Sequence, residues 1–455
     1  MHLVVVGGSD AGIAAALRAR ELDHQVSVTV AVADGFPNFS ICGLPFWLGG
    51  EVLEWTSLAH RTVAELEAAG VELLLGEAAR EVDPSSRRVT LAADGSAREV
   101  SYDRLVLATG AQPVRPPLPG LELPGVHLLH TMDDAFALAG ALDGAESAAI
   151  IGAGYIGLEM AEALVHRGLG VTVIEQLPEV LATVDAPLGA LAREQLAGHG
   201  VEVSCGVRVE GIERHGDRLR VQTDSTAPLD ADVVLVSVGV RPASELAVEA
   251  GAELGARGAI AVDRRMATSL PDVWAAGDCV HTHHRLLAEP GYLPLGTTAH
   301  KQGRVAGENA VGGDREFAGS LGTQVVRVFD WAFARTGLRD REARAAGFEP
   351  LTVAATALDH KAYYPGAHEL HMRVTGDAVS GRLLGCQLAG HRDAQVAKRI
   401  DIPAAALFNE LSVDEMSDLD LAYTPPFGSP WDALQIGAQA WDAARSATPS
   451  LATDA

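Results

Sequence analysis

The chain has 455 residues, of which 48% are hydrophobic and 21% charged, and its formal net charge is −25. At roughly 150 residues per domain, this length predicts two or three domains, and the composition is that of a globular protein with a large core. The strong negative charge argues against nucleic acid or an anionic membrane surface as a partner, because both are bound through basic patches.

The N-terminal segment HLVVVGGSDAGIAAALRAREL, followed by VSVTVAVAD, predicts a buried strand, a glycine turn, a helix and a second parallel strand. It lacks the basic region and the cleavage site of a signal peptide, and no apolar run approaches the ~20 residues of a membrane span. The four cysteines are scattered without a CxxC pair: Cys42, Cys205, Cys279 and Cys386. We therefore expect a cytoplasmic protein without a disulfide framework or a zinc site.

The turn GGSDAG has the outer glycines of a dinucleotide-binding motif, Gly7 and Gly12, but Ser9 stands where the middle glycine is usual. Such glycines allow a tight turn and close packing of helix on strand, and the helix N-terminus binds a pyrophosphate. Asp34, at the end of the second strand, is the only candidate for the acid that holds the ribose. The turn therefore predicts a first nucleotide site.

PNFSICGLPFWLGG, residues 37–50, places Cys42 among apolar residues, prolines and glycines. No second cysteine lies nearby. Cys42 is therefore a buried core residue, half of a lost disulfide, or a redox centre that works alone, and free cysteines are often simply packed in cores.

The strand–turn–helix pattern returns at residues 148–175, where GAGYIG supplies Gly152, Gly154 and Gly157 in the order GxGxxG. Glu175 ends the next strand, 18 residues beyond Gly157. A carboxylate there would bind the adenosine ribose and repel the 2′-phosphate of NADPH, so NADH is favoured. The alternative is a glycine turn in an ordinary α/β protein.

Two stretches resemble linkers on either side of this second unit: residues 110–125, which are rich in proline and glycine, and residues 235–246. LVLATGA (105–111) and TSLPDVWAAGDC (268–279) predict strands that end in turns, and the second places Asp278 where it can hydrogen-bond a polyol. From about residue 322 the alternating segments and two amphipathic stretches predict an antiparallel sheet with helices.

The two dinucleotide turns, the ATG segment and the AAGD segment together resemble the pyridine nucleotide–disulfide oxidoreductases over residues 1 to about 443. The resemblance implies an α/β flavoprotein with two Rossmann-like domains, one for FAD and one for NADH, with NADPH less favoured, and a C-terminal α+β dimerisation domain. It also implies a homodimer whose active site is shared across subunits. The implied boundaries are 1–113 and 244–321 for FAD, 114–243 for NAD(P)H, 322–443 for dimerisation and 444–455 for a disordered tail.

The resemblance assigns cofactor contacts to the glycine turns and to the strand ends. Those in the FAD domain are Gly7, Ser9, Asp10, Ala11, Gly12, Asp34, Cys42, Ala108, Thr109, Gly110, Gly277, Asp278, Thr298 and Ala299. Those in the NADH domain are Gly152, Gly154, Tyr155, Ile156, Gly157, Glu159, Glu175 and Gly239. Asp278 is expected at the flavin ribitol, Tyr155 over the flavin and Glu159 beside the nicotinamide amide.

CGLPF followed by LGGEV is similar to the single-cysteine branch of the family: coenzyme A disulfide reductase, NADH oxidase and NADH peroxidase. A cysteine at a helix start beside a flavin is expected to have a lowered pKa and to react as the thiolate. The cycle would form a mixed disulfide or persulfide on Cys42.

The segments YYPGA (363–367) and LAYTPPFGSPWDAL (421–434) also resemble the coenzyme A disulfide reductase-like group. In that group they reach the active site of the partner subunit. Tyr363, Tyr364 and Tyr423 are thereby expected to line the site and to donate a hydrogen bond or proton to the leaving thiolate. The alternative for all three is aromatic packing.

Asp10 stands where oxidase and peroxidase members carry a histidine, which weakens peroxide and oxygen chemistry, because an aspartate needs a large pKa shift to act near neutrality. Three substitutions put coenzyme A in doubt: Glu21 for an arginine, Ile41 for an asparagine and Trp431 for a lysine. His300 is kept.

The candidate substrate residues are Arg18, Ile41, His300 and Trp431. Since positive charge is lost around them, a disulfide or persulfide smaller or less anionic than coenzyme A is favoured.

The expected function is hydride transfer from NADH through FAD to Cys42, which reduces a small disulfide or persulfide. The alternatives are an NADH oxidase that makes water or hydrogen peroxide through a cysteine sulfenic acid, and a slow NADH-responsive redox sensor. The histidines of HTHH (281–284) have no completing cysteine or carboxylate, so no metal is expected.

Overall fold

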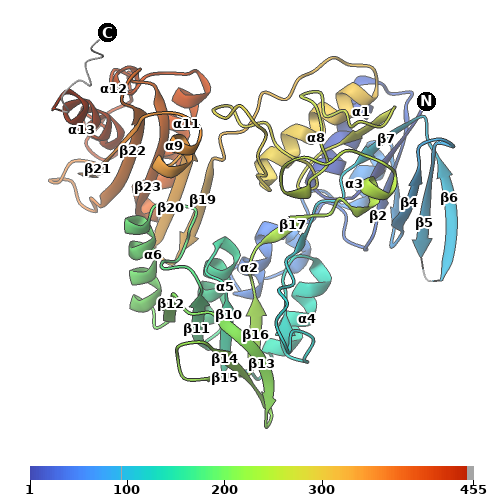
Figure 1. Cartoon of the computed structure of the whole chain (residues 1–455), viewed down its shortest axis with the longest axis horizontal. Helices are drawn as coiled ribbons and strands as arrows, with labels where there is room; N and C mark the ends of the chain where they lie inside the picture. The colour runs from blue at the N-terminus through green and yellow to red at the C-terminus, as the bar shows by residue number, and fades with distance from the viewer. Residues whose placement is uncertain (94, 448–455) are drawn as a thin grey trace.

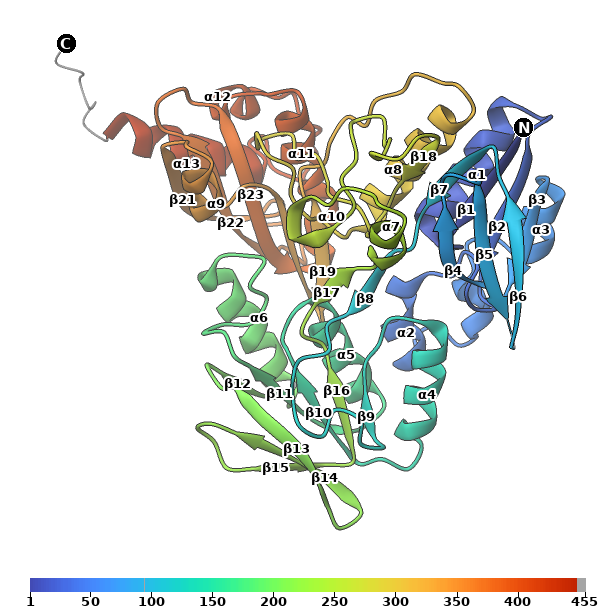
Figure 2. The same ribbon diagram turned by 45° about the vertical axis from the view of Figure 1, so that its right-hand side comes forward.

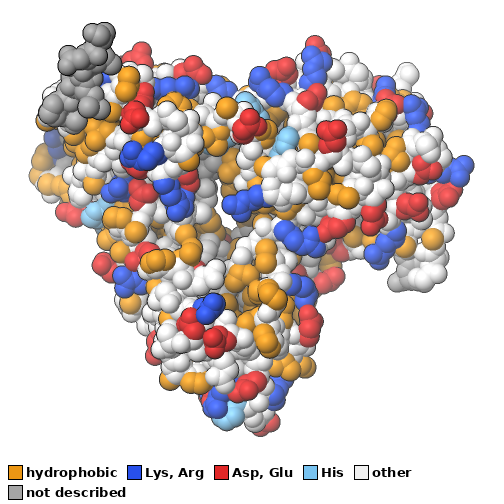
Figure 3. Space-filling model, in the orientation of Figure 1, with side chains coloured by type: hydrophobic (Ala, Val, Ile, Leu, Met, Phe, Trp, Pro, Cys, Tyr) orange, Lys and Arg blue, Asp and Glu red, His pale blue; other side chains and the backbone are white. Residues whose placement is uncertain are grey.

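The computed structural model describes residues 1–93 and 95–447. The chain folds into three bodies, and the N-terminal and middle segments, blue and yellow in Figure 1, share one of them. The second body is green and the third orange to red. The face drawn in Figure 3 is hollowed between the C-terminal body and the other two, and acidic and basic side chains are interspersed over it.

The first body is built on a parallel sheet with the order β18-β7-β1-β2-β3. Its three central strands are near-continuous runs of buried Val, Leu and Ala, as expected for strands covered on both faces. The strands are β1 His2–Val6, β2 Ser27–Val32, β3 Val71–Leu75, β7 Arg104–Leu107 and β18 Val273–Ala275. The short helices of this body are α3 Val63–Ala68 and α7 Glu245–Glu249, whereas α2 Leu44–Leu48 packs against α4 and α5 of the second body. Because β18 joins a sheet made from the first 107 residues, two distant segments form one body.

Helices α1 (Asp10–Leu22) and α8 (Gly296–Ala310) pack very closely on this sheet. Glycines make the approach possible: a Cβ at Gly303 would lie 2.2 Å from the Ala11 carbonyl oxygen, and one at Gly307 would lie 2.2 Å from that of Ala15. The N-terminal ends of both helices are thereby held side by side at the carboxyl edge of the sheet.

The second body has a parallel sheet with the order β12-β11-β10-β16-β9 and a three-stranded antiparallel sheet, β13-β14-β15. The parallel strands are β9 Val126–His127, β10 Ser147–Ile151, β11 Gly170–Glu175, β12 Glu202–Cys205 and β16 Val233–Val236. The helices are α4 Met132–Leu142, α5 Tyr155–His166 and α6 Ala186–Gly198, and the small sheet has β13 Val209–His215, β14 Arg218–Thr223 and β15 Leu229–Ala231.

The chain crosses between the first two bodies twice, and the two crossings pair with each other. Strand β8 (Ala111–Pro113) lies antiparallel to β17 (Val240–Pro242), as Figure 2 shows. Both segments fall within the stretches expected to be linkers. A further antiparallel sheet of the first body has the strands β4 Ala78–Asp83, β5 Arg88–Ala93 and β6 Ser96–Ser101.

The C-terminal body is an antiparallel sheet with the order β19-β20-β23-β22-β21, covered by helices. Its strands are β19 Gln324–Val328, β20 Trp331–Gly337, β21 Pro350–Leu358, β22 Glu369–Asp377 and β23 Leu383–His391. Its helices are α9 Asp340–Ala345, α10 Val396–Arg399, α11 Asp401–Phe408, α12 Val413–Ser417 and α13 Ala433–Ala447. The first four residues of the expected tail thus belong to α13, and residues 448–455 lie outside the described part.

Among residues 1–93 and 95–447, no helix combines the length and the apolar character needed to cross a bilayer.

Candidate active site

The expected FAD contacts gather at the carboxyl edge of the first sheet. Residues 7–12 follow β1, Asp34 follows β2, residues 108–110 follow β7, residues 277–278 follow β18, and Thr298 and Ala299 begin α8. The expected NADH contacts gather likewise: residues 152–159 follow β10, Glu175 ends β11 and Gly239 follows β16. Ligands of parallel α/β sheets bind at this edge.

The first glycine turn has the backbone of a dinucleotide motif. Gly7 has φ +116°, and a Cβ there would lie 2.1 Å from the Ala108 carbonyl oxygen; a Cβ at Gly12 would lie 1.9 Å from that of Gly7. Ser9 is the N-cap of α1, yet its side chain makes no capping hydrogen bond. The N–H groups of the first turn are therefore available to a phosphate, which fits FAD.

The second turn repeats this arrangement. A Cβ at Gly152 would lie 2.3 Å from the Ser237 carbonyl oxygen, and one at Gly157 would lie 2.1 Å from that of Gly152. Gly154 caps α5 and faces open space, which fits the approach of a pyrophosphate. The Glu175 carboxylate accepts hydrogen bonds from the N–H groups of Ala153 at 2.7 Å and Leu177 at 2.8 Å, so it braces the turn from the ribose position.

Cys42 lies in the single turn Ile41–Gly43, ahead of α2, and it is exposed. Its pKa is raised from the ordinary value because the surrounding protein desolvates the thiolate and because the carboxylates of Glu159, Asp10 and Asp278 repel it. The protein groups around Cys42 therefore act against the lowered pKa that was predicted for this thiol beside a flavin. Helix α2 has only five residues, so its dipole is too small to offset three carboxylates.

Two of these carboxyl groups titrate near neutrality. Burial, together with the charge of Glu162, raises the pKa of Glu159 to about 7. Burial, together with the charge of Asp10, raises the pKa of Asp278 to about 6. Carboxyl groups with raised pKa values that act on one thiol are typical of active sites.

Tyr155 begins α5, and its hydroxyl is buried without a hydrogen bond of good geometry. Burial raises the pKa of Tyr155 to about 12, so this phenol stays protonated at neutral pH.

The candidate substrate residues differ in their solvent exposure and in their ion pairs. His300 is half exposed, and its Nε2 lies 3.3 Å from Asp10 Oδ1. Arg18 forms ion pairs with Glu308 at 2.6 Å and with Glu21 at 2.9 Å, so two carboxylates of the protein already compensate its positive charge. Ile41 and Trp431 are exposed.

The predicted tyrosines lie on the C-terminal body. Tyr363 is 74% exposed, and Tyr364 and Tyr423 are also exposed, as are the neighbouring Phe427 and Trp431. No contact joins the three tyrosines to Cys42 within the described part of the chain. They are open to a second molecule.

The ion network behind Glu159 was not predicted from the sequence. Glu162 is buried one turn further along α5, where it accepts a hydrogen bond from the Phe329 N–H at 2.8 Å and pairs with Arg327 at 2.7 Å. Arg327 also pairs with Glu51. The i,i+3 spacing of two glutamates was the only signal, and it did not identify the arginine more than 160 residues away.

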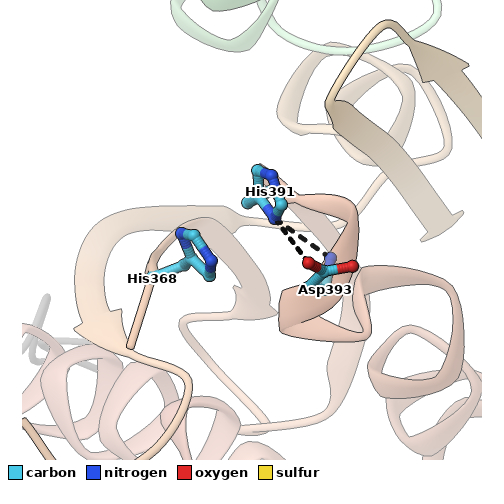
Figure 4. A group of neighbouring side chains, drawn as sticks. All are labelled: His368, His391 and Asp393. Atoms are coloured by element: carbon cyan, nitrogen blue, oxygen red, sulfur yellow. Dashed lines mark hydrogen bonds and ion pairs between the residues drawn. The ribbon is translucent and has the colours of Figure 1, made fainter. Parts of the chain in front are cut away.

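Two histidines of the HTHH stretch bond backbone groups. His281 bonds the backbone of Val262, and His284 bonds the Leu286 N–H. Elsewhere His368 and His391 stack at 4.1 Å, and His391 Nδ1 accepts a hydrogen bond from the Asp393 N–H (Figure 4). The possible ligand atoms of His368, His391 and Asp393 lie within 4.8 Å of one another, as do those of Glu51, Glu162 and His166.

Comparison with known proteins decides the family. Residues 1–303 match the pyridine nucleotide-disulphide oxidoreductase family, and residues 323–433 match the dimerisation domain of that family. The chain belongs to the pyridine nucleotide-disulphide oxidoreductases. It is therefore an oxidoreductase of a family that uses FAD and NAD(P)H, as predicted, and the predicted fold is confirmed.

Three similar proteins stand out. The NADH oxidase of Methanocaldococcus jannaschii is 31% identical over 96% of this chain and 98% of its own length. The CoA-dependent NAD(P)H sulfur oxidoreductase of Pyrococcus furiosus is 33% identical over 95% of this chain and 97% of its own. The solved structure of an NAD-dependent persulfide reductase from A. fulgidus has a TM-score of 0.95 and 37% identity, and covers 98% of this chain and 84% of that one.

Proposed function

We propose that the protein oxidises NADH and uses Cys42 to reduce a small disulfide or persulfide. The observation that carries this proposal is a single exposed thiol at the edge between two dinucleotide turns, surrounded by carboxylates. Similarity to the A. fulgidus persulfide reductase and to the P. furiosus sulfur oxidoreductase supports sulfur as the acceptor.

The first glycine turn and Asp278 would hold FAD, and the second turn with Glu175 would hold NADH. Bound FAD would relay two electrons between the nicotinamide and the sulfur. Glu175 would accept hydrogen bonds from the adenosine ribose and disfavour a 2′-phosphate, which supports NADH over NADPH.

The charges of the site favour an acceptor that is not strongly anionic. Three carboxylates act on Cys42, and Arg18 is already paired with two glutamates. The phosphates of coenzyme A would therefore find little free positive charge on α1. A low-molecular-weight disulfide or persulfide meets no such cost.

A homodimer would complete the site. The exposed aromatic residues Tyr363, Tyr364, Tyr423, Phe427 and Trp431 lie on the body that matches the dimerisation domain. A second copy would cover them and bring tyrosine hydroxyls toward the partner's thiol. All four cysteines are free, which supports a reducing compartment such as the cytoplasm.

An NADH oxidase is the second candidate, because the M. jannaschii relative carries that name. In that reaction Cys42 would pass through a sulfenic acid, which is consistent with an exposed thiol.

The test is NADH consumption by the FAD-loaded protein and by Cys42→Ser, with and without small disulfides and persulfides, under air and under argon. Turnover that requires the sulfur acceptor and is lost in Cys42→Ser supports the proposal. Full turnover with oxygen alone would support the oxidase, and negligible turnover with every acceptor would support a redox sensor.

A further inference from the structure

The helix that follows Cys42 belongs to the first segment of the chain but packs on the second body. The turn that holds Cys42 runs directly into α2. Leu44 and Leu48 are buried in the core of the second body, and a Cβ at Gly49 would lie 3.0 Å from the Cα of Ala163 in α5. The position of the thiol therefore depends on how α2 lies on α5.

One arginine of the C-terminal body lies at the end of this helix contact. Arg327, on β19, pairs with Glu162 of α5 at 2.7 Å, and its Nη1 donates to the carboxylate of Glu51, just beyond α2, at 2.9 Å. Its guanidinium carbon lies 5.0 Å from the centre of the Phe46 ring, within α2 itself. A guanidinium can bind two carboxylates with its edges and an aromatic ring with its face. Arg327 therefore links α2, α5 and β19.

The bond to Glu51 acts on the cysteine helix through the backbone. The N–H groups of Glu51 and Val52 both donate to the Phe46 carbonyl, at 2.9 and 3.1 Å, so the residues after α2 fold back on its last turn. Phe46 is four residues from Cys42. A displacement of Glu51 would therefore move the helix that begins beside the thiol.

Attachment of the C-terminal body to α5 does not depend on this guanidinium. Glu162 also accepts a hydrogen bond from the Phe329 N–H at 2.8 Å, which joins α5 to the residues just after β19. The guanidinium adds the contacts with Glu51 and Phe46. An ion pair with a carboxylate as exposed as that of Glu51 contributes little to stability, so its effect here is mainly geometric.

We propose that Arg327 is a positioning residue for the sulfur step, because it holds α2, and Cys42 with it, at one place on α5; this rests on the proposed function. Helix α5 begins at the second dinucleotide turn and carries Tyr155 and Glu159. Arg327 thereby keeps the thiol at a constant place relative to the end of α5 where the nicotinamide is expected. Reaction rates are sensitive to such placement, since a shift of about 1 Å in a reacting group can cost 100-fold.

The test uses the FAD-loaded protein with four changes: Glu51→Gln, Arg327→Gln, both together, and Arg344→Gln as the matched control. Arg344 belongs to the same body and pairs with Asp340 within α9 at 3.2 Å. Glu51→Gln removes the ion pair beside α2 and leaves the buried Glu162 paired with Arg327. It therefore remains informative even where Arg327→Gln does not fold.

Each variant is examined by its structure and by its rates. Hydrogen–deuterium exchange of residues 44–52 reports how firmly α2 is held, and thermal unfolding gives Tm. Anaerobic stopped-flow absorbance gives, per bound flavin, the rate of reduction by NADH and the rate at which the reduced protein reacts with hydroxyethyl disulfide. In the second reaction the disulfide takes up the two electrons that NADH supplied, together with two protons, and leaves as two thiols.

We expect Glu51→Gln and Arg327→Gln to speed exchange in residues 44–52 and to slow the reaction with hydroxyethyl disulfide by about 10- to 100-fold, the cost of a misplaced reacting group. Reduction by NADH should change much less in Glu51→Gln, because α5 keeps its other bond to the C-terminal body. The double variant should be no slower than Arg327→Gln, since both changes break one link, and Arg344→Gln should match the unchanged protein.

Normal exchange and normal rates in Glu51→Gln and Arg327→Gln would overturn the proposal. A lower Tm with an unchanged rate per bound flavin would also overturn it, because that is the result of a purely stabilising ion pair. If the unchanged protein reduces neither hydroxyethyl disulfide nor any persulfide, the proposed function fails and the role of Arg327 in it fails too. Reduction of either acceptor at one rate in all variants rejects the role of Arg327 alone.

Discussion

At the scale of single residues, the environment of Cys42 is more negative than its neighbours in sequence indicate. The surrounding segment is apolar, and the carboxylates that act on the thiol come from Asp10, Glu159 and Asp278, which belong to different elements. The protein's own groups therefore raise the pKa of Cys42 and oppose the thiolate.

Removal of one of these charges should make Cys42 more acidic. In Glu159→Gln a neutral amide replaces a carboxyl group whose pKa is about 7, so its repulsion of the thiolate above neutral pH is lost. We expect the pH profile of Cys42 alkylation by iodoacetamide to move to lower pH. The exposed Glu146→Gln serves as control and should leave the profile in place; a profile that moves to higher pH in Glu159→Gln would contradict this account.

At the scale of elements, the contact between α1 and α8 sets the position of the site. Gly303→Ala should push α8 away from α1, because the new Cβ meets the Ala11 backbone at 2.2 Å. Overpacking of this kind costs about 1–3 kcal/mol. We expect a lower Tm and weaker flavin retention, measured by thermal unfolding and by flavin absorbance.

Gly140→Ala provides the matched control for this substitution. Gly140 lies inside α4 and has open space around it, so alanine there should stabilise the helix by about 0.5–1 kcal/mol. If Gly303→Ala were as stable as Gly140→Ala, the close contact between the helices would be unimportant.

The glycine turns were predictable because the dinucleotide motif depends on local spacing, and Gly7, Gly12, Gly152 and Gly157 take the expected positions. The ion pairs were not predictable. Arg327 and Glu162 lie far apart in the sequence and meet only in the folded chain, so no local spacing indicates their contact. The effect of the protein on the pKa of Cys42 was not predictable for the same reason: it depends on carboxylates that only the tertiary structure brings together.

At the scale of the whole molecule, Glu342 of the C-terminal body positions two arginines that contact the second body. Glu342 binds the guanidinium groups of Arg335 and Arg339 at 2.6 Å each. Arg339 in turn donates to the Ala182 carbonyl at 2.6 Å, and Arg335 to that of Thr183 at 2.9 Å. One carboxylate thus organises two arginines that join the two bodies.

This arrangement should make the protein sensitive to acid. Burial opposes ionisation of Glu342, but hydrogen bonds from the two arginines prevail and lower its pKa from 4.5 to about 2. Its stabilisation is therefore full above pH 4.5 and is lost as the pH falls toward 2. The shift corresponds to about 3 kcal/mol.

Glu342→Gln should accordingly be less stable than the unchanged protein at neutral pH and should lose less between pH 4.5 and 2. Urea unfolding across this range measures both effects. Parallel stability curves for the two proteins would contradict the assigned role of Glu342.

In the proposed reaction, substrate sulfur becomes covalently bound to Cys42 and is released when NADH is supplied. Intact-protein mass spectrometry of the FAD-loaded protein under argon tests it directly, after a small disulfide or persulfide is added and again after NADH. We expect an added mass on one thiol, absent in Cys42→Ser and lost on addition of NADH. An adduct that persists with NADH, or that forms equally in Cys42→Ser, would contradict it.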